Sequence, residues 1–129
     1  MSETKEKTIL IIDDQKDFRF ILTFDLKKNG YKTIEAENGE KGIEIAKSAI
    51  PDLILLDRKM PGADGIEVCK RLKADNVTKD IPVLMITGKS QTGELTECLE
   101  AGAVGILTKP FKFENLLSKI KNIFWESAS

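Results

Sequence analysis

Short apolar segments that alternate with longer amphipathic segments constrain the fold of this chain most strongly. Most of the short segments are continuously apolar, as in Ile9–Ile12 and Leu53–Leu56. A strand is continuously apolar when both faces of its sheet are covered, which is typical of parallel sheets with helices on either side. The pattern therefore predicts an α/β fold.

Five strand–helix units can be delimited from this pattern and from the helix-capping and helix-breaking residues Gly30, Asn38 and Pro51. Strands are expected over Thr8–Ile12, Tyr31–Ala36, Leu53–Leu56, Pro82–Ile86 and Val104–Leu107. Helices are expected over Gln15–Asn29, Gly39–Ala49, Ile66–Ala74, Glu94–Ala101 and Phe113–Trp125. The sum is a doubly wound, five-stranded parallel sheet with five helices. We expect a single domain over residues 1–129, with an ordered core from about 7 to 125.

Helical spacing assigns a buried and an exposed side to each predicted helix. The buried sides are expected to carry Phe18, Ile21 and Leu22 in the first helix, Ile43, Ala46 and Ile50 in the second, and Leu95, Cys98 and Leu99 in the fourth. The outer side of the fourth helix is expected to carry Glu94, Glu97 and Glu100.

Charge and composition exclude several classes of function. The net charge is −1 with no basic run, so neither nucleic acid nor an anionic membrane is an expected partner. The longest apolar runs are too short to span a bilayer, and the polar start Met1–Lys7 lacks a signal-peptide core, so a cytoplasmic protein is expected. Cys69 and Cys98 are expected to be reduced and half-buried. Histidine is absent, which excludes chemistry that needs a histidine in this chain.

Polar side chains follow four of the predicted strands. Asp13 and Asp14 come after the first strand, Asp57 after the third, Thr87 after the fourth, and Lys109 close to the end of the fifth. Ligands of open α/β sheets bind at the carboxyl ends of the strands, so these side chains are expected to lie together at one edge.

Such a cluster suits phosphoryl chemistry. Three neighbouring carboxylates need a cation, and oxygen ligands with open positions favour Mg²⁺, for which Mn²⁺ can substitute. An ammonium, a hydroxyl and the cation together match the oxygens of a phosphoryl group in transfer, and an aspartate can act as nucleophile.

Simpler interpretations remain open for each of these residues. The Asp13–Asp14 pair could only cap the first helix, and Asp57 could be a solubilising residue at a strand end. Thr87 could be an ordinary turn hydroxyl and Lys109 a solvated lysine. The two glycines of the loop after Asp57, Gly62 and Gly65, are expected to serve turn geometry alone.

Taken in order, these motifs resemble the receiver domains of two-component response regulators, the single-domain chemotaxis type included. The matching segments cover about residues 7 to 124 and are Ile11–Asp14, Leu55–Asp57, Met60–Gly65, Met85–Thr87, Ala101–Ala103 and Lys109–Phe111. The resemblance implies a flavodoxin-like sheet with strand order 2-1-3-4-5. It also implies phosphorylation by a histidine kinase or phosphotransfer protein.

The resemblance further implies roles for single residues. Asp57 is implied as the phospho-acceptor and Asp14 as a direct Mg²⁺ ligand, while Asp13 helps to hold the metal through water. The backbone carbonyl of Lys59 is implied as another metal ligand.

Two further residues of the site are assigned in the same way. Lys109 is implied to pair with the phosphoryl group and to precede a cis peptide bond to Pro110. Thr87 is implied to donate a hydrogen bond to the phosphoryl group and to move on activation.

Some positions depart from the family pattern. Ile106 stands where many receiver domains carry a Tyr or Phe switch, so we expect conformational change mainly in the Gly88–Gly93 loop. Lys59 and Lys89 flank the site; they either gate access and pair with Asp13 or Asp14, or are simply solvated.

The first helix departs from the pattern as well. Phe20 and Phe24 lie one helical turn apart where charged residues are usual, and Asp25 stands where an apolar residue is common. We expect Phe20 to be exposed and the pair to form a docking or self-association patch. In the alternative, Phe24 turns inward in place of Asp25.

The leading hypothesis is a phospho-acceptor switch that changes partner binding through the face near the fourth and fifth helices and slowly dephosphorylates itself. It would be a monomer or weak dimer with a protein target, and not a turnover enzyme. The alternative is a phosphorylation-independent binding module, which Ile106 favours. A hydrolase with an aspartyl nucleophile is disfavoured, because such enzymes commonly need an acid at the position of Lys59.

Overall fold

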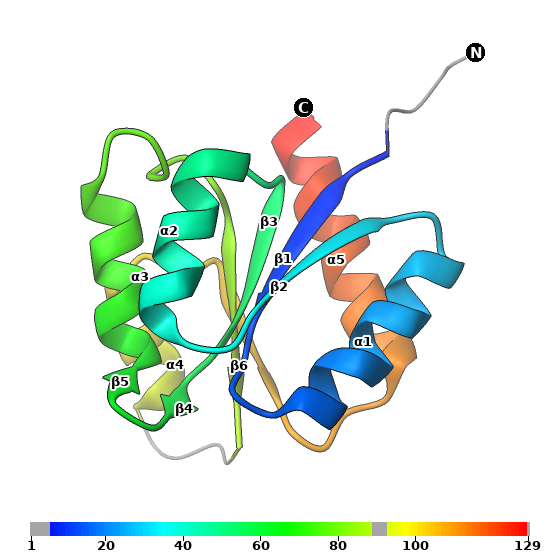
Figure 1. The fold of residues 1–129 in the computed structure, drawn as a ribbon, viewed down its shortest axis with the longest axis horizontal. Helices are drawn as coiled ribbons and strands as arrows, with labels where there is room; N and C mark the ends of the chain where they lie inside the picture. Colours follow the sequence, from blue (N-terminus) through cyan, green and yellow to red (C-terminus); the bar gives the residue numbers. More distant parts are fainter. Residues whose placement is uncertain (1–5, 89–92, 129) are drawn as a thin grey trace.

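The computed structural model, which describes residues 6–88 and 93–128, contains one five-stranded parallel sheet flanked by helices (Figure 1). The long strands are β1 (Thr8–Ile12), β2 (Lys32–Ala36), β3 (Leu53–Asp57), β6 (Val83–Thr87) and β7 (Gly105–Thr108). The helices are α1 (Lys16–Lys28), α2 (Gly39–Ala49), α3 (Gly65–Ala74), α4 (Glu94–Glu100) and α5 (Phe113–Ala128). Two short strands, β4 (Lys59–Met60) and β5 (Ala63–Asp64), form an antiparallel hairpin that the sequence pattern did not predict.

The order of the strands confirms the predicted topology. The sheet runs β2-β1-β3-β6-β7, which is 2-1-3-4-5 when the five long strands are numbered along the chain. Every pair in it is parallel, for example with Leu10 opposite Ile54 and Asp57 opposite Ile86. The chain order reverses beside β1, between β1 and β3, where a doubly wound sheet opens a crevice at its carboxyl edge.

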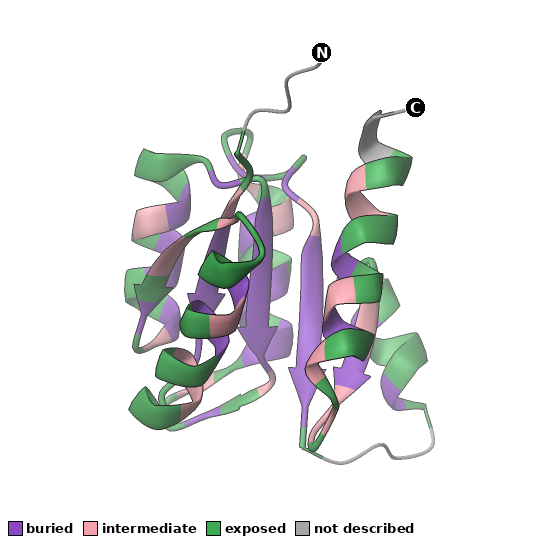
Figure 2. Cartoon of the chain, turned by 90° about the vertical axis from the view of Figure 1, so that its right-hand side faces the viewer, coloured by how far each residue is buried: buried purple, intermediate pink, exposed green. Residues whose placement is uncertain are grey.

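Alternate residues of the strands supply two separate cores, one on each face of the sheet. Leu10, Ile54 and Met85 point toward α2, α3 and α4, whereas Ile9, Leu55 and Ile86 point toward α1 and α5. Figure 1 shows α1 and α5 on one side of the sheet and α2 and α3 on the other, and Figure 2 shows the strands buried between them. Burial on both faces explains why these strands are continuously apolar in sequence.

Several predicted side-chain orientations were wrong. Ile21 in α1 is 58% exposed, and Ile50 lies just after α2 in the left-handed conformation and is 51% exposed. In α4 only Cys98 is buried from the predicted apolar side, since Leu95 and Leu99 are about half exposed. The α4 helix begins after Gly93 and has seven residues, which are too few to form a wide apolar stripe.

Candidate functional site

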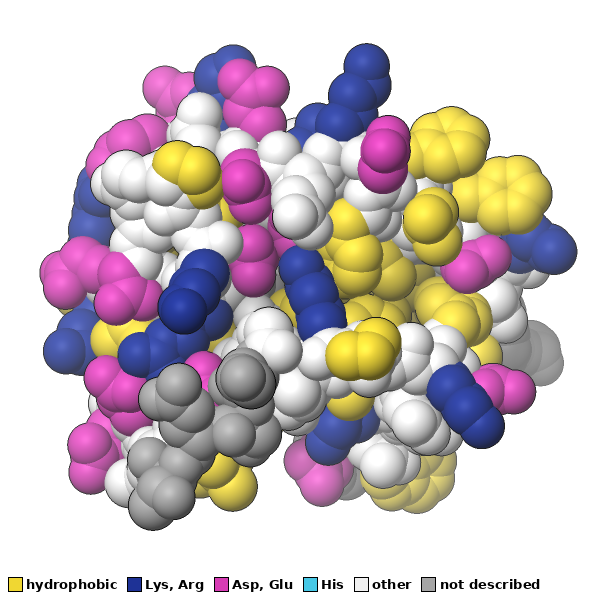
Figure 3. Space-filling view, turned by 90° about the horizontal axis from the view of Figure 1, so that it is seen from below, with side chains coloured by type: hydrophobic (Ala, Val, Ile, Leu, Met, Phe, Trp, Pro, Cys, Tyr) yellow, Lys and Arg dark blue, Asp and Glu magenta, His cyan; other side chains and the backbone are white. Residues whose placement is uncertain are grey.

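The three predicted acidic residues meet at the carboxyl edge of the sheet. Asp13 and Asp14 follow β1, Asp57 ends β3, and each offers a carboxylate oxygen within 4.8 Å of the others. Asp13 and Asp57 are buried and Asp14 is exposed, so the cluster opens toward solvent on one side. Figure 3, seen from below Figure 1, shows acidic and basic side chains side by side on this end of the molecule.

Asp13 is held by contacts on both carboxylate oxygens. Oδ1 accepts a hydrogen bond from the backbone amide of Gln15 at 2.8 Å, and Oδ2 lies 3.3 Å from Nζ of Lys109. Its carbonyl accepts from Arg19 at 2.7 Å, and Arg19 also pairs with Glu35 of β2. The first bond closes a local turn before α1, whose N-cap is Gln15 and has no side-chain capping bond in the described part of the chain, while the other oxygen of Asp13 faces the cluster.

Asp57 is an aspartate in an unfavourable electrostatic environment. Burial, and after it the nearby Asp13 carboxylate, raises its pKa to about 6, while Lys109 and the backbone amide of Lys59 act against this. Nζ of Lys109 lies 3.9 Å from Oδ1 of Asp57. A surface residue that only improved solubility would not be 6% exposed with its pKa displaced in this way.

Thr87 and Lys109 reach the same edge from β6 and from the segment after β7. The backbone amide of Lys109 donates to the carbonyl of Thr87 at 2.6 Å, and the peptide bond from Lys109 to Pro110 is cis, as predicted. The Thr87 hydroxyl is buried and has no hydrogen-bond partner within the described part of the chain. A buried hydroxyl without a partner is costly, which points to a ligand that it can bind.

Gly65 allows helix α3 to begin directly against the backbone that carries Asp57. Its amide donates to the carbonyl of Arg58 at 2.7 Å, and a Cβ at this position would lie 2.6 Å from the carbonyl oxygen of Asp57. The prediction that Gly62 and Gly65 serve turn geometry alone was thus half right. Gly62 has φ +77°, whereas Gly65 is needed for close approach.

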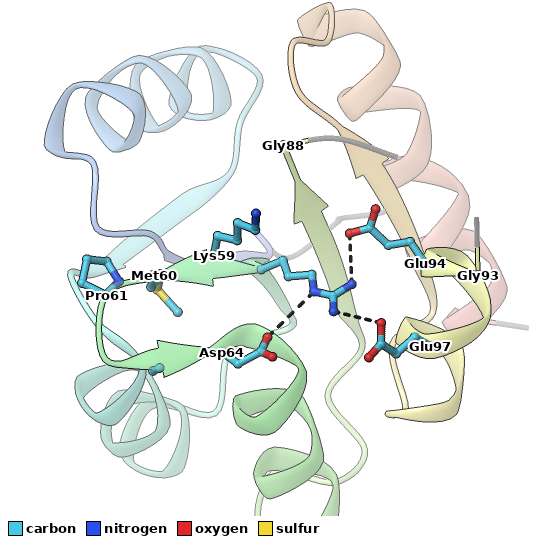
Figure 4. Close-up of a pocket in the computed structure, with 10 residues that line it drawn as sticks. Lys59, Met60, Pro61, Asp64, Gly88, Gly93, Glu94 and Glu97 are labelled. Carbon is cyan, nitrogen blue, oxygen red and sulfur yellow. Dashed lines mark hydrogen bonds and ion pairs between the residues drawn. The ribbon is translucent and has the colours of Figure 1, made fainter. Parts of the chain in front are cut away.

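Arg58, which follows Asp57, connects this edge to helix α4. Its guanidinium lies 3.1 Å from Glu94, 2.9 Å from Glu97 and 3.8 Å from Asp64 (Figure 4). The prediction that Glu94 lies on the outer side of the helix was wrong, because it is 7% exposed and turns inward to Arg58. Sequence reasoning missed Arg58, since no periodicity relates residues 36 positions apart.

Comparison with known proteins identifies the family. The family model described as "Response regulator receiver domain" matches residues 9–121. The chain belongs to the response regulator receiver domain family. Among the described residues, no helix has the length and apolar character needed to cross a membrane.

Relatives of this receiver domain include transcriptional regulators. It is 41% identical over 117 residues to the phosphate regulon transcriptional regulatory protein PhoB of Pseudomonas aeruginosa, covering 91% of this chain and 51% of that protein. It is also 41% identical over 113 residues to the DNA-binding dual master transcriptional regulator RpaA of Synechocystis, covering 88% and 47%. The chain thus spans about half the length of these curated relatives.

Solved structures with the same fold include chemotaxis and receiver domain proteins. The chemotaxis protein CheY4 of Vibrio cholerae has a TM-score of 0.87 and 30% identity, covering 92% of this chain and 98% of that one. A CheY-like receiver domain protein of Methanospirillum hungatei has a TM-score of 0.88 and 27% identity, covering 95% and 96%.

The positions at which this receiver domain departs from the family pattern have mixed outcomes. Ile106 is half-buried against the core beneath α2, α3 and α4. Lys59 is exposed and pairs with neither Asp13 nor Asp14 in the described part of the chain; Lys109 takes the contact with Asp13 instead. Lys89 and most of the Gly88–Gly93 loop lie outside the described residues.

The prediction that Phe20 of α1 is exposed is confirmed, and Phe24 is exposed beside it. Phe20 is 68% and Phe24 is 56% exposed, and their rings stack with centroids 6.5 Å apart. The alternative in which Phe24 turns inward is wrong. Asp25 itself is half-buried and, with Ile21, lines a hollow beside α1.

Proposed function

We propose that this receiver domain is a signalling switch that accepts a phosphoryl group on Asp57 in a Mg²⁺-dependent reaction. The observation that carries the proposal is the convergence of three groups at one edge of the sheet: a buried carboxylate, an ammonium, and a hydroxyl that has no partner among the described residues. They are Asp57, Lys109 and Thr87, and three separate strands position them.

The acidic residues fit a divalent metal. Asp13, Asp14 and Asp57 provide hard oxygen donors within reach of one ion, and the exposed side of Asp14 leaves room for water and phosphoryl oxygens. Mg²⁺, or Mn²⁺ in its place, would neutralise charge on the phosphoryl oxygens during transfer. We propose Asp14 as a direct ligand, Asp13 as a ligand through water, and the carbonyl of Lys59 as a further ligand.

The chain's own residues would act as follows. An oxygen of Asp57 forms the new P–O bond while the P–N bond of a phosphohistidine or the P–O bond of acetyl phosphate breaks, and the electron pair leaves with imidazole or acetate. With a pKa of about 6, Asp57 is mainly a carboxylate at neutral pH and therefore nucleophilic. Lys109 lies close enough to balance the charge of the product, and Thr87 can donate its hydroxyl proton in a hydrogen bond to it.

Output and lifetime follow from the same arrangement. Movement of Thr87 toward the phosphoryl group would displace the chain that leads into α4. The first turn of α4 forms ion pairs with Arg58, the residue after the acceptor. We propose that partner binding changes on the face near α4 and α5, and that water slowly hydrolyses the acyl phosphate. Hydrolysis would return the chain to its unphosphorylated state, and no external substrate would be converted.

Partners are inferred from the family and from the surface. Receiver domains pair with histidine kinases and downstream targets, and here a histidine kinase or phosphotransfer protein would supply the phosphoryl group. The stacked Phe20–Phe24 pair is a candidate docking patch, since exposed aromatic pairs more often mark contacts than chance. A downstream protein target, a monomer or weak dimer, and a cytoplasmic location remain predictions.

Phosphorylation by acetyl phosphate tests the proposal against a phosphorylation-independent binding module. We expect labelling that requires Mg²⁺ or Mn²⁺ and that Asp14→Ala abolishes while the circular dichroism spectrum stays native. Glu44→Ala, an exposed carboxylate on α2, is the matched control and should be labelled like the wild type. Undiminished labelling of Asp14→Ala would contradict the metal assignment, and a folded wild type that is never labelled would favour the binding module.

A further inference from the structure

Lys109 contacts a third group besides the two aspartates. Its Nζ lies 4.0 Å from the centroid of the Phe18 ring, which belongs to the first turn of α1. The two other lysine–aromatic contacts of the described chain, Lys28 with Phe24 and Lys7 with Phe124, are longer, at 5.5 and 5.6 Å. The ammonium of Lys109 therefore lies among Asp13, Asp57 and the face of a ring.

The Phe18 ring that faces Lys109 has packing partners of its own. Phe18 is half-buried and packs against the core beneath α1 and α5. The ring of Phe111 meets it edge-on, with centroids 6.1 Å apart and planes at 84°. Phe111 comes two residues after Lys109, so one segment carries both the ammonium and the ring that supports its contact.

Without the contact to Phe18, the Lys109 ammonium could turn away from the aspartates toward solvent. A hollow of about 610 Å³ opens beside it, lined by Phe18, Lys109, Phe111 and Phe113 among others, and Figure 3 shows hydrophobic side chains around a depression on this end of the molecule. Lysine has a flexible four-carbon stem and a strongly hydrated head, so its ammonium readily turns toward water. An aromatic face attracts a cation and also covers the side from which water would reach it.

We propose that Phe18 is a positioning residue for phosphoryl transfer, whose ring face holds the Lys109 ammonium over the two buried carboxylates. This inference rests on the proposed phosphorylation of Asp57. The ring does not touch the phosphoryl group; it keeps the charge that must meet that group in place before the donor arrives, which lowers the cost of organising the site. Aromaticity at this position, beyond apolar volume, is the property that matters.

Graded fluorination of Phe18 separates this role from ordinary packing. Mono-, di- and trifluorophenylalanine nearly keep the shape of the ring but progressively weaken the negative potential of its face. We expect the logarithm of the acetyl phosphate labelling rate, at saturating Mg²⁺, to fall linearly along the series. The total loss should be about three- to tenfold, as befits one partly buried cation–π contact. The same series at Phe113, which lines the hollow but has no cation over its ring in the described chain, is the control and should be flat.

A second measurement does not depend on phosphorylation. The ε-methylene proton resonances of Lys109 should be shifted upfield by the Phe18 ring current in the wild type, and Phe18→Leu should remove the shift. A flat labelling series at Phe18, or unshifted Lys109 resonances in the wild type, would overturn the inference. If the wild type takes up no phosphoryl group although the ring-current shift is present, the proposed function fails and the role of Phe18 in transfer fails with it.

Discussion

Replacing Asp57 by Asn tests the electrostatic account of the site without any phosphoryl donor. In the metal-free protein the buried Asp57 carboxylate is unfavourable, because burial and Asp13 raise its pKa from 3.8 to about 6. Asn is neutral at every pH and keeps an oxygen that can accept the hydrogen bond from the Lys59 amide. We therefore expect Asp57→Asn to be more stable than the wild type at neutral pH.

The size of the effect follows from the two pKa values. The native state holds the Asp57 proton more tightly than the unfolded state, so the free energy of unfolding of the wild type falls as pH rises from about 4 to about 6. Each pKa unit corresponds to about 1.36 kcal/mol, so the difference between 3.8 and about 6 sets a ceiling of about 3 kcal/mol. Because Asp14 leaves one side of the cluster open to solvent, we expect about 1–3 kcal/mol at neutral pH. We expect almost no difference below about pH 4.

Urea unfolding in the presence of EDTA, repeated across this pH range, measures the effect. The two stability curves should coincide at low pH and separate as Asp57 ionises, and Mg²⁺ should then narrow the gap by stabilising the wild type alone. A stability difference that is the same at every pH would contradict an electrostatic origin, since it would reflect packing and not charge. So would a variant that is less stable than the wild type at neutral pH.

The remaining predictions concern neighbouring positions. Gly65→Ala places a Cβ against the Asp57 carbonyl and should lower the free energy of unfolding by about 1–3 kcal/mol; an unchanged urea midpoint would contradict this. Arg58→Gln removes the guanidinium that pairs with the first turn of α4 and should cost about 1–3 kcal/mol. It should also speed hydrogen exchange in α4, and unaltered exchange there would count against the contact. Phe20→Glu should slow transfer from a phosphohistidine protein but not from acetyl phosphate. Ile50→Glu, at another exposed apolar side chain, should affect neither donor, and equal effects of Phe20→Glu on both donors would reject docking at Phe20.

The sequence predicts the sheet and its functional edge because both depend on local signals. Runs such as Leu53–Leu56 indicate doubly covered strands, and parallel strands must bring their carboxyl ends to one edge. For that reason the sequence alone is enough to group Asp13, Asp57 and Thr87. The strand boundaries differ from the predicted ones by only one residue in a case such as β6, which begins at Val83 and ends at Thr87.

What the sequence does not predict depends on contacts between distant residues. Glu94 turns inward and forms an ion pair with Arg58, and hydrophobic periodicity contains no information about such a pair. The close approach at Gly65 depends on how α3 meets β3, which turn statistics cannot show. Helical spacing places Phe18 on the core side of α1, and the ring does pack there; its other partner is a lysine 91 residues later, which spacing cannot indicate.

Phosphorylation of Asp57 can be tested by mapping the modified residue. The protein would be incubated with acetyl phosphate and Mg²⁺, reduced with borohydride, which converts an aspartyl phosphate to homoserine, and analysed by peptide mass spectrometry. We expect homoserine at position 57 alone, and none when EDTA replaces Mg²⁺. Homoserine at another aspartate, or an unmodified position 57 in protein that is folded and metal-loaded, would contradict it.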